Sequence, residues 1–146
     1  MYERILVPTD GSDPSETAVE HAVDIASQYG GTVDALFVVD ESYPAVAHWD
    51  MYVDREEDAG EGALDVAVAA CEDAGVAVER HLRRGKPHEE IIDAADDYGT
   101  DLIVMGTHGR TGLDRFASTG SVTERVVRLT TVPVLVVGGA RAAAEA

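Results

Sequence analysis

The sequence predicts a single α/β domain built on an open, five-stranded parallel sheet with helices on both faces. Five short aliphatic blocks recur along the chain, and such blocks are typical of strands that are buried on both faces. Each segment between two blocks is long enough for a crossover helix, which favours parallel pairing and right-handed connections. A length of 146 residues fits one compact domain spanning residues 1–146.

The first strand and the helix after it are marked by their flanking residues. Residues 5–7 form the first aliphatic block. Asp13 is the expected N-cap of the helix, because Pro14 stands at its first position and Glu16 completes a capping box. Gly30 follows the amphipathic stretch and is expected to end the helix.

Four further blocks continue the alternation. They lie at residues 35–39, 76–78, 102–105 and 134–137. Apolar residues at helical spacing precede the last two blocks, as expected for helices that pack on a sheet. The stretch from 41 to about 54 is expected to be the one long irregular connection, and the tail 140–146 is expected to be disordered.

The charge and hydropathy of the chain limit its partners. Its 28 acidic and 11 basic side chains give a formal net charge of -17. Duplex nucleic acid requires a cationic surface, so we expect no nucleic-acid partner. The aliphatic runs are far shorter than the ~18 residues of a membrane span, and the N-terminus does not resemble a signal peptide. We therefore expect no membrane partner and a cytoplasmic location.

The basic residues are almost all arginine, since Lys86 is the only lysine. An acid-rich, lysine-poor composition suits a protein that stays hydrated in concentrated salt, so we expect a halophilic protein whose stability rises with added KCl. An ordinary acidic protein is the alternative, and a melting temperature that does not rise with salt would favour it.

Polar residues and glycines follow the first and fourth blocks, where each predicted strand ends. Pro8, Thr9 and Asp10 come directly after the first block, and a glycine-rich run begins at Gly106 after the fourth. In an open parallel sheet, ligands bind beyond the carboxyl ends of the strands, at the point where the strand order reverses. These two clusters are therefore the candidate ligand site.

The glycine-rich cluster has features that suit phosphate. Glycine lets the backbone adopt positive φ and approach an oxyanion closely. The run leads to the start of the last predicted helix, near Ser121, where free N–H groups and the positive end of the helix dipole favour anions. Arg110 adds a local positive charge and His108 a polar group. A tight connection without a ligand is the plain alternative.

These residues resemble the motifs of the universal stress protein family. The resemblance covers nearly the whole chain and rests on the runs Ile5-Leu6-Val7-Pro8-Thr9-Asp10-Gly11-Ser12, Gly106-Thr107-His108-Gly109 with Gly120-Ser121-Val122-Thr123, and Val132-Pro133-Val134-Leu135-Val136-Val137. It implies an adenine nucleotide alpha hydrolase-like sheet of order 3-2-1-4-5, with the switch point between the first and fourth strands. It also implies a stress-response or regulatory module that binds ATP, with magnesium or manganese between the phosphate oxygens.

The resemblance assigns positions to the nucleotide. The residues that it places there are Pro8, Thr9, Asp10, Val38, Met105, Gly106, Gly109, Arg110, Gly120, Ser121 and Val122. Thr9 and Val38 would line the adenine side, and Asp10 would lie near the ribose or a metal-bound water. Met105 and Gly106 would flank the ribose and the α-phosphate. The plainer interpretation makes Asp10 a turn cap and Val38 and Met105 core residues.

The β- and γ-phosphates would be held by the backbone N–H groups of Gly109, Gly120, Ser121 and Val122 and by the Ser121 hydroxyl. Ten residues separate Gly109 from Gly120, one more than in the ATP-binding branch of the family. The extra residue either bulges within the loop and leaves the helix start intact, or turns the N–H groups away from the phosphates. The second outcome would leave a dimeric interaction module of the same fold that has lost nucleotide binding.

Fast catalysis is not expected. Phosphoryl transfer needs a positioned nucleophile and a cation clamp, and no lysine follows the glycine-rich run. We expect a nucleotide sensor with at most slow ATP hydrolysis, and a phosphoryl- or adenylyl-transferring enzyme is a third interpretation. The histidines lack metal-ligand spacing, and the single cysteine, Cys71, excludes a cysteine-based cluster, so no protein metal site is predicted.

The resemblance also implies a homodimer. The last strand, from Val132 to Val137, would lie at the edge of the sheet, and an apolar edge is an aggregation hazard unless it is covered. Pairing of this strand with its copy across a two-fold axis would cover it. Protein clients are also expected.

Overall fold

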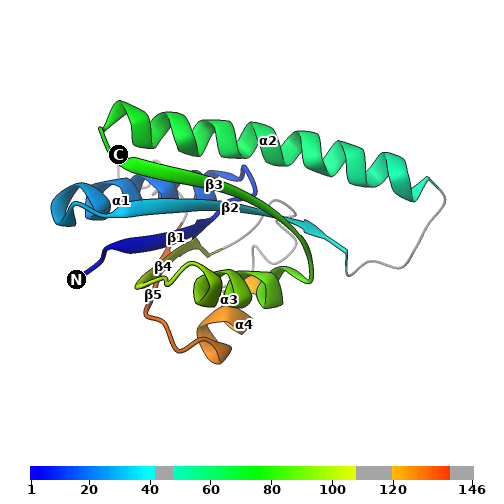
Figure 1. Cartoon of the computed structure of the whole chain (residues 1–146). Helices are drawn as coiled ribbons and strands as arrows, with labels where there is room; N and C mark the ends of the chain where they lie inside the picture. Colours follow the sequence, from blue (N-terminus) through cyan, green and yellow to red (C-terminus); the bar gives the residue numbers. More distant parts are fainter. Residues whose placement is uncertain (42–47, 108–119, 139–146) are drawn as a thin grey trace, which may run out of the picture.

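The computed structural model describes residues 1–41, 48–107 and 120–138. The described residues form a five-stranded sheet of order β3-β2-β1-β4-β5, and all of its strand pairs are parallel (Figure 1). The predicted fold and strand order are therefore confirmed. The elements in chain order are β1 (Arg4–Pro8), α1 (Asp13–Tyr29), β2 (Thr32–Asp40), α2 (Trp49–Asp73), β3 (Ala77–Gly85), α3 (Pro87–Asp97), β4 (Leu102–Gly106), α4 (Ser121–Leu129) and β5 (Val134–Val137).

Two helical layers enclose the sheet. In Figure 1, α2 runs along one face of the sheet, and α3 and α4 lie against the other. The core divides accordingly: Phe37 and Leu64 belong to the cluster under α1 and α2, whereas Leu6, Ile103 and Val126 belong to the cluster under α3 and α4. The central strands are buried on both faces, which explains why they are continuous aliphatic runs in the sequence.

The N-cap of α1 is Ser12, one residue earlier than predicted. Ser12 has extended backbone angles, and its side-chain oxygen accepts a hydrogen bond from the backbone N–H of Ser15 at 3.3 Å. Asp13 is already helical. Its negative charge lies in the first turn, where it interacts favourably with the positive end of the helix dipole. The predicted end of the helix is confirmed, because Gly30 adopts the left-handed conformation with φ of 65°.

Two elements extend beyond their predicted bounds. Helix α2 begins at Trp49, inside the stretch predicted to be irregular, where the Trp49 and Tyr52 rings stack and the Tyr52 hydroxyl donates to the Asp40 carbonyl oxygen at 3.0 Å. Strand β3 pairs with β2 over nine positions. Its later residues are polar because β3 is an edge strand, and its arginines pair with acidic residues of the neighbouring helices.

Two glycines in α2 allow a direct test of this packing. A Cβ at Gly60 would lie 2.5 Å from the ring of Phe37, whereas a Cβ at Gly62 would meet nothing within 4 Å. We expect Gly60→Ala to lower the free energy of unfolding by about 1–2 kcal/mol through overpacking. Gly62→Ala should raise it by roughly 0.5–1 kcal/mol because alanine is the better helix former. Urea unfolding of both variants measures the difference, and equal effects would contradict the packing of α2 on β2.

Candidate functional site

The candidate site lies where β1 and β4 end, at the centre of the sheet. Strand β1 pairs with β2 on one side and with β4 on the other, so the direction of the crossovers reverses between β1 and β4. The carboxyl ends of two such strands form the crevice in which open α/β sheets bind ligands.

The chain leaves β1 through a tightly bonded turn. Thr9 is 5% exposed, its N–H donates to the Leu36 carbonyl oxygen at 2.8 Å, and its hydroxyl lies 3.1 Å from the Ser15 hydroxyl. The Asp10 carboxylate accepts a hydrogen bond from the Ser12 N–H at 3.0 Å. Asp10 thus caps the turn into α1, as its plainer interpretation predicts, and still lies at the end of β1.

Two helices begin beside Gly106, the last residue of β4. A Cβ at Gly106 would lie 2.7 Å from the carbonyl carbon of Pro14, so the first turn of α1 packs directly on the strand. From the other side, the Thr123 hydroxyl of α4 donates to the Gly106 carbonyl oxygen at 2.8 Å. The positive ends of two helix dipoles therefore meet at the end of one strand.

The residues on either side of the segment 108–119 are joined by a hydrogen bond. The backbone N–H of Gly120 donates to the carbonyl oxygen of Thr107. The Thr107 N–H in turn donates to the Val137 carbonyl oxygen at 2.9 Å, which ties the same residue to β5. The position of α4 is thus fixed by β4 itself.

The first turn of α4 offers backbone N–H groups at this crevice. Ser121 and Val122 are its first two residues, and the N–H groups of a first helical turn have no acceptor within their own helix. The N–H of Gly120, the N-cap, donates to the Thr107 carbonyl oxygen, so this donor is used within the protein. No side chain caps this helix among the described residues.

Pro8, Val38 and Met105 belong to three adjacent strands and lie near their carboxyl ends. Val38 and Met105 pack in the core under α3 and α4, as their plainer interpretation predicts, and side-chain alternation places Pro8 on the same face. The structure therefore brings together nine of the eleven predicted site residues around the ends of β1, β2, β4 and the start of α4. Gly109 and Arg110, like His108, lie outside the described residues.

The sequence analysis assigned no role in the site to Pro14, Thr107 or Thr123. Each acts through a contact with a residue distant in the sequence or through its backbone. Thr123 is 4% exposed, and its place in the motif run that begins at Gly120 is the sequence signal that could have pointed to it.

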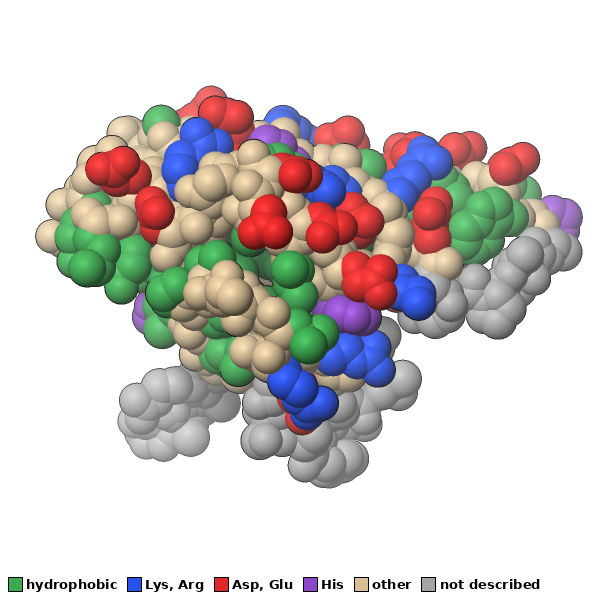
Figure 2. Space-filling view, turned by 60° about the horizontal axis from the view of Figure 1, so that its bottom comes forward, with side chains coloured by type: hydrophobic (Ala, Val, Ile, Leu, Met, Phe, Trp, Pro, Cys, Tyr) green, Lys and Arg blue, Asp and Glu red, His purple; other side chains and the backbone are tan. Residues whose placement is uncertain are grey.

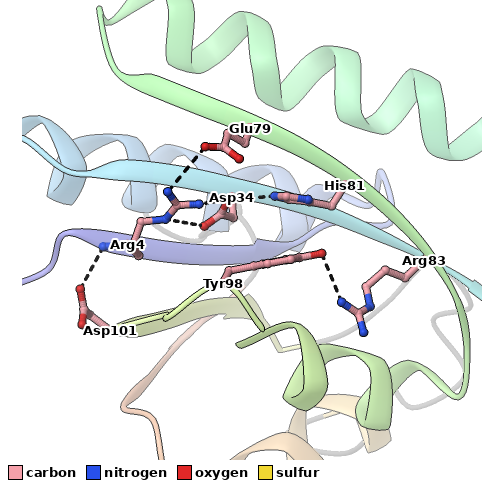
Figure 3. A network of polar contacts seen from close by, with 7 residues as sticks. All are labelled: Arg4, Asp34, Glu79, His81, Arg83, Tyr98 and Asp101. Atoms are coloured by element: carbon pink, nitrogen blue, oxygen red, sulfur yellow. Dashed lines mark hydrogen bonds and ion pairs between the residues drawn. The ribbon is translucent and has the colours of Figure 1, made fainter. Parts of the chain in front are cut away.

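A second polar cluster lies at the opposite, amino-terminal end of the strands (Figure 3). Asp34 is fully buried, and its two carboxylate oxygens accept hydrogen bonds from Arg4, at 3.0 Å from Nε and 2.6 Å from Nη2. The Nε2 atom of His81 lies 2.9 Å from the same carboxylate, and the Tyr98 ring stacks on the His81 ring with centroids 4.0 Å apart. Glu79 pairs with Arg4 at 3.6 Å.

Asp34, Glu79 and His81 could be taken for a metal site, because their ligand atoms lie within 4.8 Å of one another. The guanidinium of Arg4, however, already supplies the positive charge between the two carboxylates. The hydrogen bond to Asp34 raises the pKa of Arg4 further, so this charge is permanent. We therefore interpret the cluster as an ion-pair network that joins β1, β2 and β3.

Cys71 is not a candidate nucleophile. It is fully buried in the core, and burial raises the pKa of its thiol to about 11. The thiolate is the reactive form of cysteine, and a raised pKa keeps the thiol protonated. Cys71 is therefore a structural residue.

The formal net charge of -17 is reflected on the surface of the described residues. On the face drawn in Figure 2, acidic side chains gather along the upper part, and lysine or arginine side chains lie close to several of them. Within the described residues, no helix is both long and apolar enough to cross a membrane.

The comparison with known proteins places this chain in one family. The model of the universal stress protein family matches residues 1–138. The chain belongs to the universal stress protein family. Universal stress protein MJ0531 of Methanocaldococcus jannaschii is 40% identical to it, over 94% of this chain and 82% of the relative.

Solved universal stress proteins share the fold closely. The structure of UspA from Lactobacillus plantarum matches with a TM-score of 0.80 at 29% identity, covering 93% of this chain and 97% of that one. A universal stress protein from Archaeoglobus fulgidus, solved in complex with dAMP, matches with a TM-score of 0.72 at 26% identity, covering 93% and 98%. A further universal stress protein structure, solved in complex with cAMP, matches with a TM-score of 0.69 at 25% identity, covering 94% of this chain and 97% of that one.

Proposed function

We propose that this universal stress protein is a regulatory module that binds ATP at the carboxyl ends of β1 and β4. The observation that carries the proposal is the meeting of two helix N-termini at Gly106, made by the Pro14 contact and the Thr123 hydrogen bond. Helix N-termini are favourable sites for phosphate. The related structures that contain dAMP and cAMP support an adenine nucleotide as the ligand.

The phosphates are assigned to the first turn of α4. Ser121 and Val122 would donate their backbone N–H groups to the β- and γ-phosphates, and Ser121 would add its hydroxyl. Because the Gly120 N–H donates to Thr107, Gly120 would contribute mainly by letting the phosphates approach the backbone without a side chain. Gly109 and Arg110 keep their assigned roles as a backbone donor and a local positive charge.

The nucleoside is assigned to the strand ends. Pro8, Val38 and Met105 line one face of three adjacent strands and would contact adenine and ribose, together with Thr9 and Gly106. Asp10 would lie near the ribose. Magnesium or manganese would be held by phosphate oxygens and water, with Asp10 as the nearby carboxylate.

The proposed activity is nucleotide sensing with at most slow hydrolysis. The single lysine of the chain, Lys86, lies at the start of α3 and not in the first turn of α4. Without a lysine on the phosphates and without a positioned nucleophile, phosphoryl transfer is expected to be slow. Binding of ATP would instead change the affinity of the protein for its client proteins in the cytoplasm.

Isothermal titration calorimetry with Mg-ATP tests the proposal. We expect saturable binding of about one nucleotide per chain, in molar KCl because the acidic composition suggests a halophilic protein. Absence of heat, together with absence of nucleotide in the purified protein, would overturn the proposal. That result would favour the alternative, a dimeric interaction module that has lost nucleotide binding.

We also propose that the protein is a homodimer through β5. Four apolar side chains of α4 and β5 are substantially exposed in the single chain: Val127, Leu129, Leu135 and Val136. Strand β5 is an edge strand of the sheet, and pairing with a second copy would bury this surface. Sedimentation equilibrium in high salt tests the assembly, and a monomer at micromolar concentration would contradict it.

A further inference from the structure

We propose that the hydroxyl of Thr123 is a positioning group that aims the first turn of α4 at the bound phosphates. This inference rests on the proposed nucleotide site. Thr123 is the third residue of α4, is 4% exposed, and donates its hydroxyl to the Gly106 carbonyl oxygen at 2.8 Å. We call it a positioning residue because its hydroxyl bonds to β4 and would act on the phosphates only by holding α4 in place.

The partner of this hydroxyl sets Thr123 apart from an ordinary residue of a first helical turn. Serine and threonine side chains near helix starts usually bond to the backbone of their own helix, as caps or back-bonds. Helix α4 has no side-chain cap at Gly120, and the Thr123 hydroxyl reaches a strand carbonyl 17 positions earlier in the chain. The bond therefore fixes the helix relative to the sheet.

Thr123 is one of two anchors that enclose the proposed phosphate donors. The Gly120 N–H bonds to Thr107, and the Thr123 hydroxyl bonds to Gly106, so two consecutive residues of the β4 end hold both sides of the turn. Ser121 and Val122 lie between these anchors in the sequence. Their N–H groups are thereby held in a constant direction from the end of β4.

Loss of the Thr123 anchor should affect phosphate binding selectively. The nucleoside contacts are assigned to Pro8, Val38 and Met105, whose backbone positions are set by strand pairing within the sheet. An electrostatic donor that is free to turn away stabilises a charged ligand less than one held in place. The affinity for ATP should therefore fall, whereas the affinity for adenosine should change little.

Three variants separate positioning from general stability. Thr123→Val removes the hydroxyl at nearly constant shape, and Thr123→Ser keeps a hydroxyl. Thr130→Val is the matched control, because the Thr130 hydroxyl accepts a bond from the Val132 N–H at 3.1 Å at the other end of α4. We expect Thr123→Val to weaken ATP binding about five- to tenfold and adenosine binding less than about twofold. Thr123→Ser and Thr130→Val should bind ATP as the wild type does.

Amide hydrogen exchange in the nucleotide-free protein provides a separate readout. The Gly120 N–H, which bonds to Thr107, should exchange faster in Thr123→Val than in the wild type or in Thr130→Val. Unchanged exchange at Gly120, unchanged ATP affinity, or an equal loss for ATP and adenosine would each overturn the inference. If the wild type binds no ATP, the proposed function fails, and the exchange measurement alone then decides whether Thr123 positions α4.

Discussion

Replacement of Arg4 by methionine is expected to lower the free energy of unfolding by about 3 kcal/mol. Asp34 has no exposed surface, and Arg4 provides two of the hydrogen bonds to its carboxylate. Methionine preserves much of the apolar stem but removes the positive charge between Asp34 and Glu79, and His81 is then the side chain left at hydrogen-bond distance from the Asp34 carboxylate among the described residues. An uncompensated buried charge costs far more than an intact pair contributes. Urea unfolding at pH 7 measures the loss.

An exposed ion pair of similar chemistry provides the control for Arg4. Arg128 and Glu124 pair at 3.2 Å on the surface of α4, with side chains 68% and 61% exposed. Arg128→Met should change stability by no more than about 0.5 kcal/mol, because solvent screens such pairs. If Arg4→Met cost as little as Arg128→Met, Asp34 would have to reach solvent, and the network in Figure 3 would not stabilise the sheet.

Replacement of Gly106 by alanine should cost about 2–3 kcal/mol of stability and also weaken ATP binding. The added Cβ would lie 2.7 Å and 2.9 Å from the carbonyl carbon and oxygen of Pro14, and backbone atoms cannot turn aside as a flexible side chain can. The start of α1 must then move away from β4. Thermal unfolding measures the first effect, and calorimetry with Mg-ATP measures the second.

Gly138 is the matched control for Gly106, since it follows the end of the neighbouring strand β5. A Cβ at Gly138 would meet nothing within 4 Å. Gly138→Ala should therefore leave stability within about 0.5 kcal/mol of the wild type. A Gly106→Ala variant that is as stable as Gly138→Ala would show that α1 does not pack on the end of β4 as closely as described.

Most of the fold could be predicted from the sequence, because the central strands are buried on both faces. Residues such as Ile5, Leu6 and Val7 are all inaccessible to solvent, so each strand is an unbroken aliphatic run. Strand β3 shows the limit of this signal. As an edge strand, it carries charged side chains such as Arg80 and Arg83 that pair with helices, and only its pairing with β2 reveals its length.

The candidate site could be predicted at the level of its strand ends and glycines. Glycine and hydroxyl residues at the ends of strands are local features, and Gly106 and Ser121 lie where the motif places them. The anchors could not be predicted in the same way, because Thr123 meets Gly106 only after the sheet has formed. The N-cap at Ser12 was missed by one residue, since both Ser12 and Asp13 are good capping residues and the backbone conformation decides between them.

The ion-pair network around Asp34 could be predicted only in part. The sequence shows the buried carboxylate but does not show which residue pairs with it. Asp34 interrupts an otherwise apolar strand, and a buried carboxylate requires a hydrogen-bonding counterpart. That counterpart, Arg4, is 30 positions away and reaches Asp34 only because β1 and β2 pair in parallel. The ion pair thus follows from the topology of the sheet.

The bond between Thr107 and Gly120 also bears on how the family can evolve. Because these two residues are joined to each other, the chain between them starts and finishes at the same place whatever its length. An insertion there costs only a small additional loop-closure entropy. Homologues could therefore differ in the length of this segment, and with it in ligand preference, while keeping the hydrogen bond that joins its two ends.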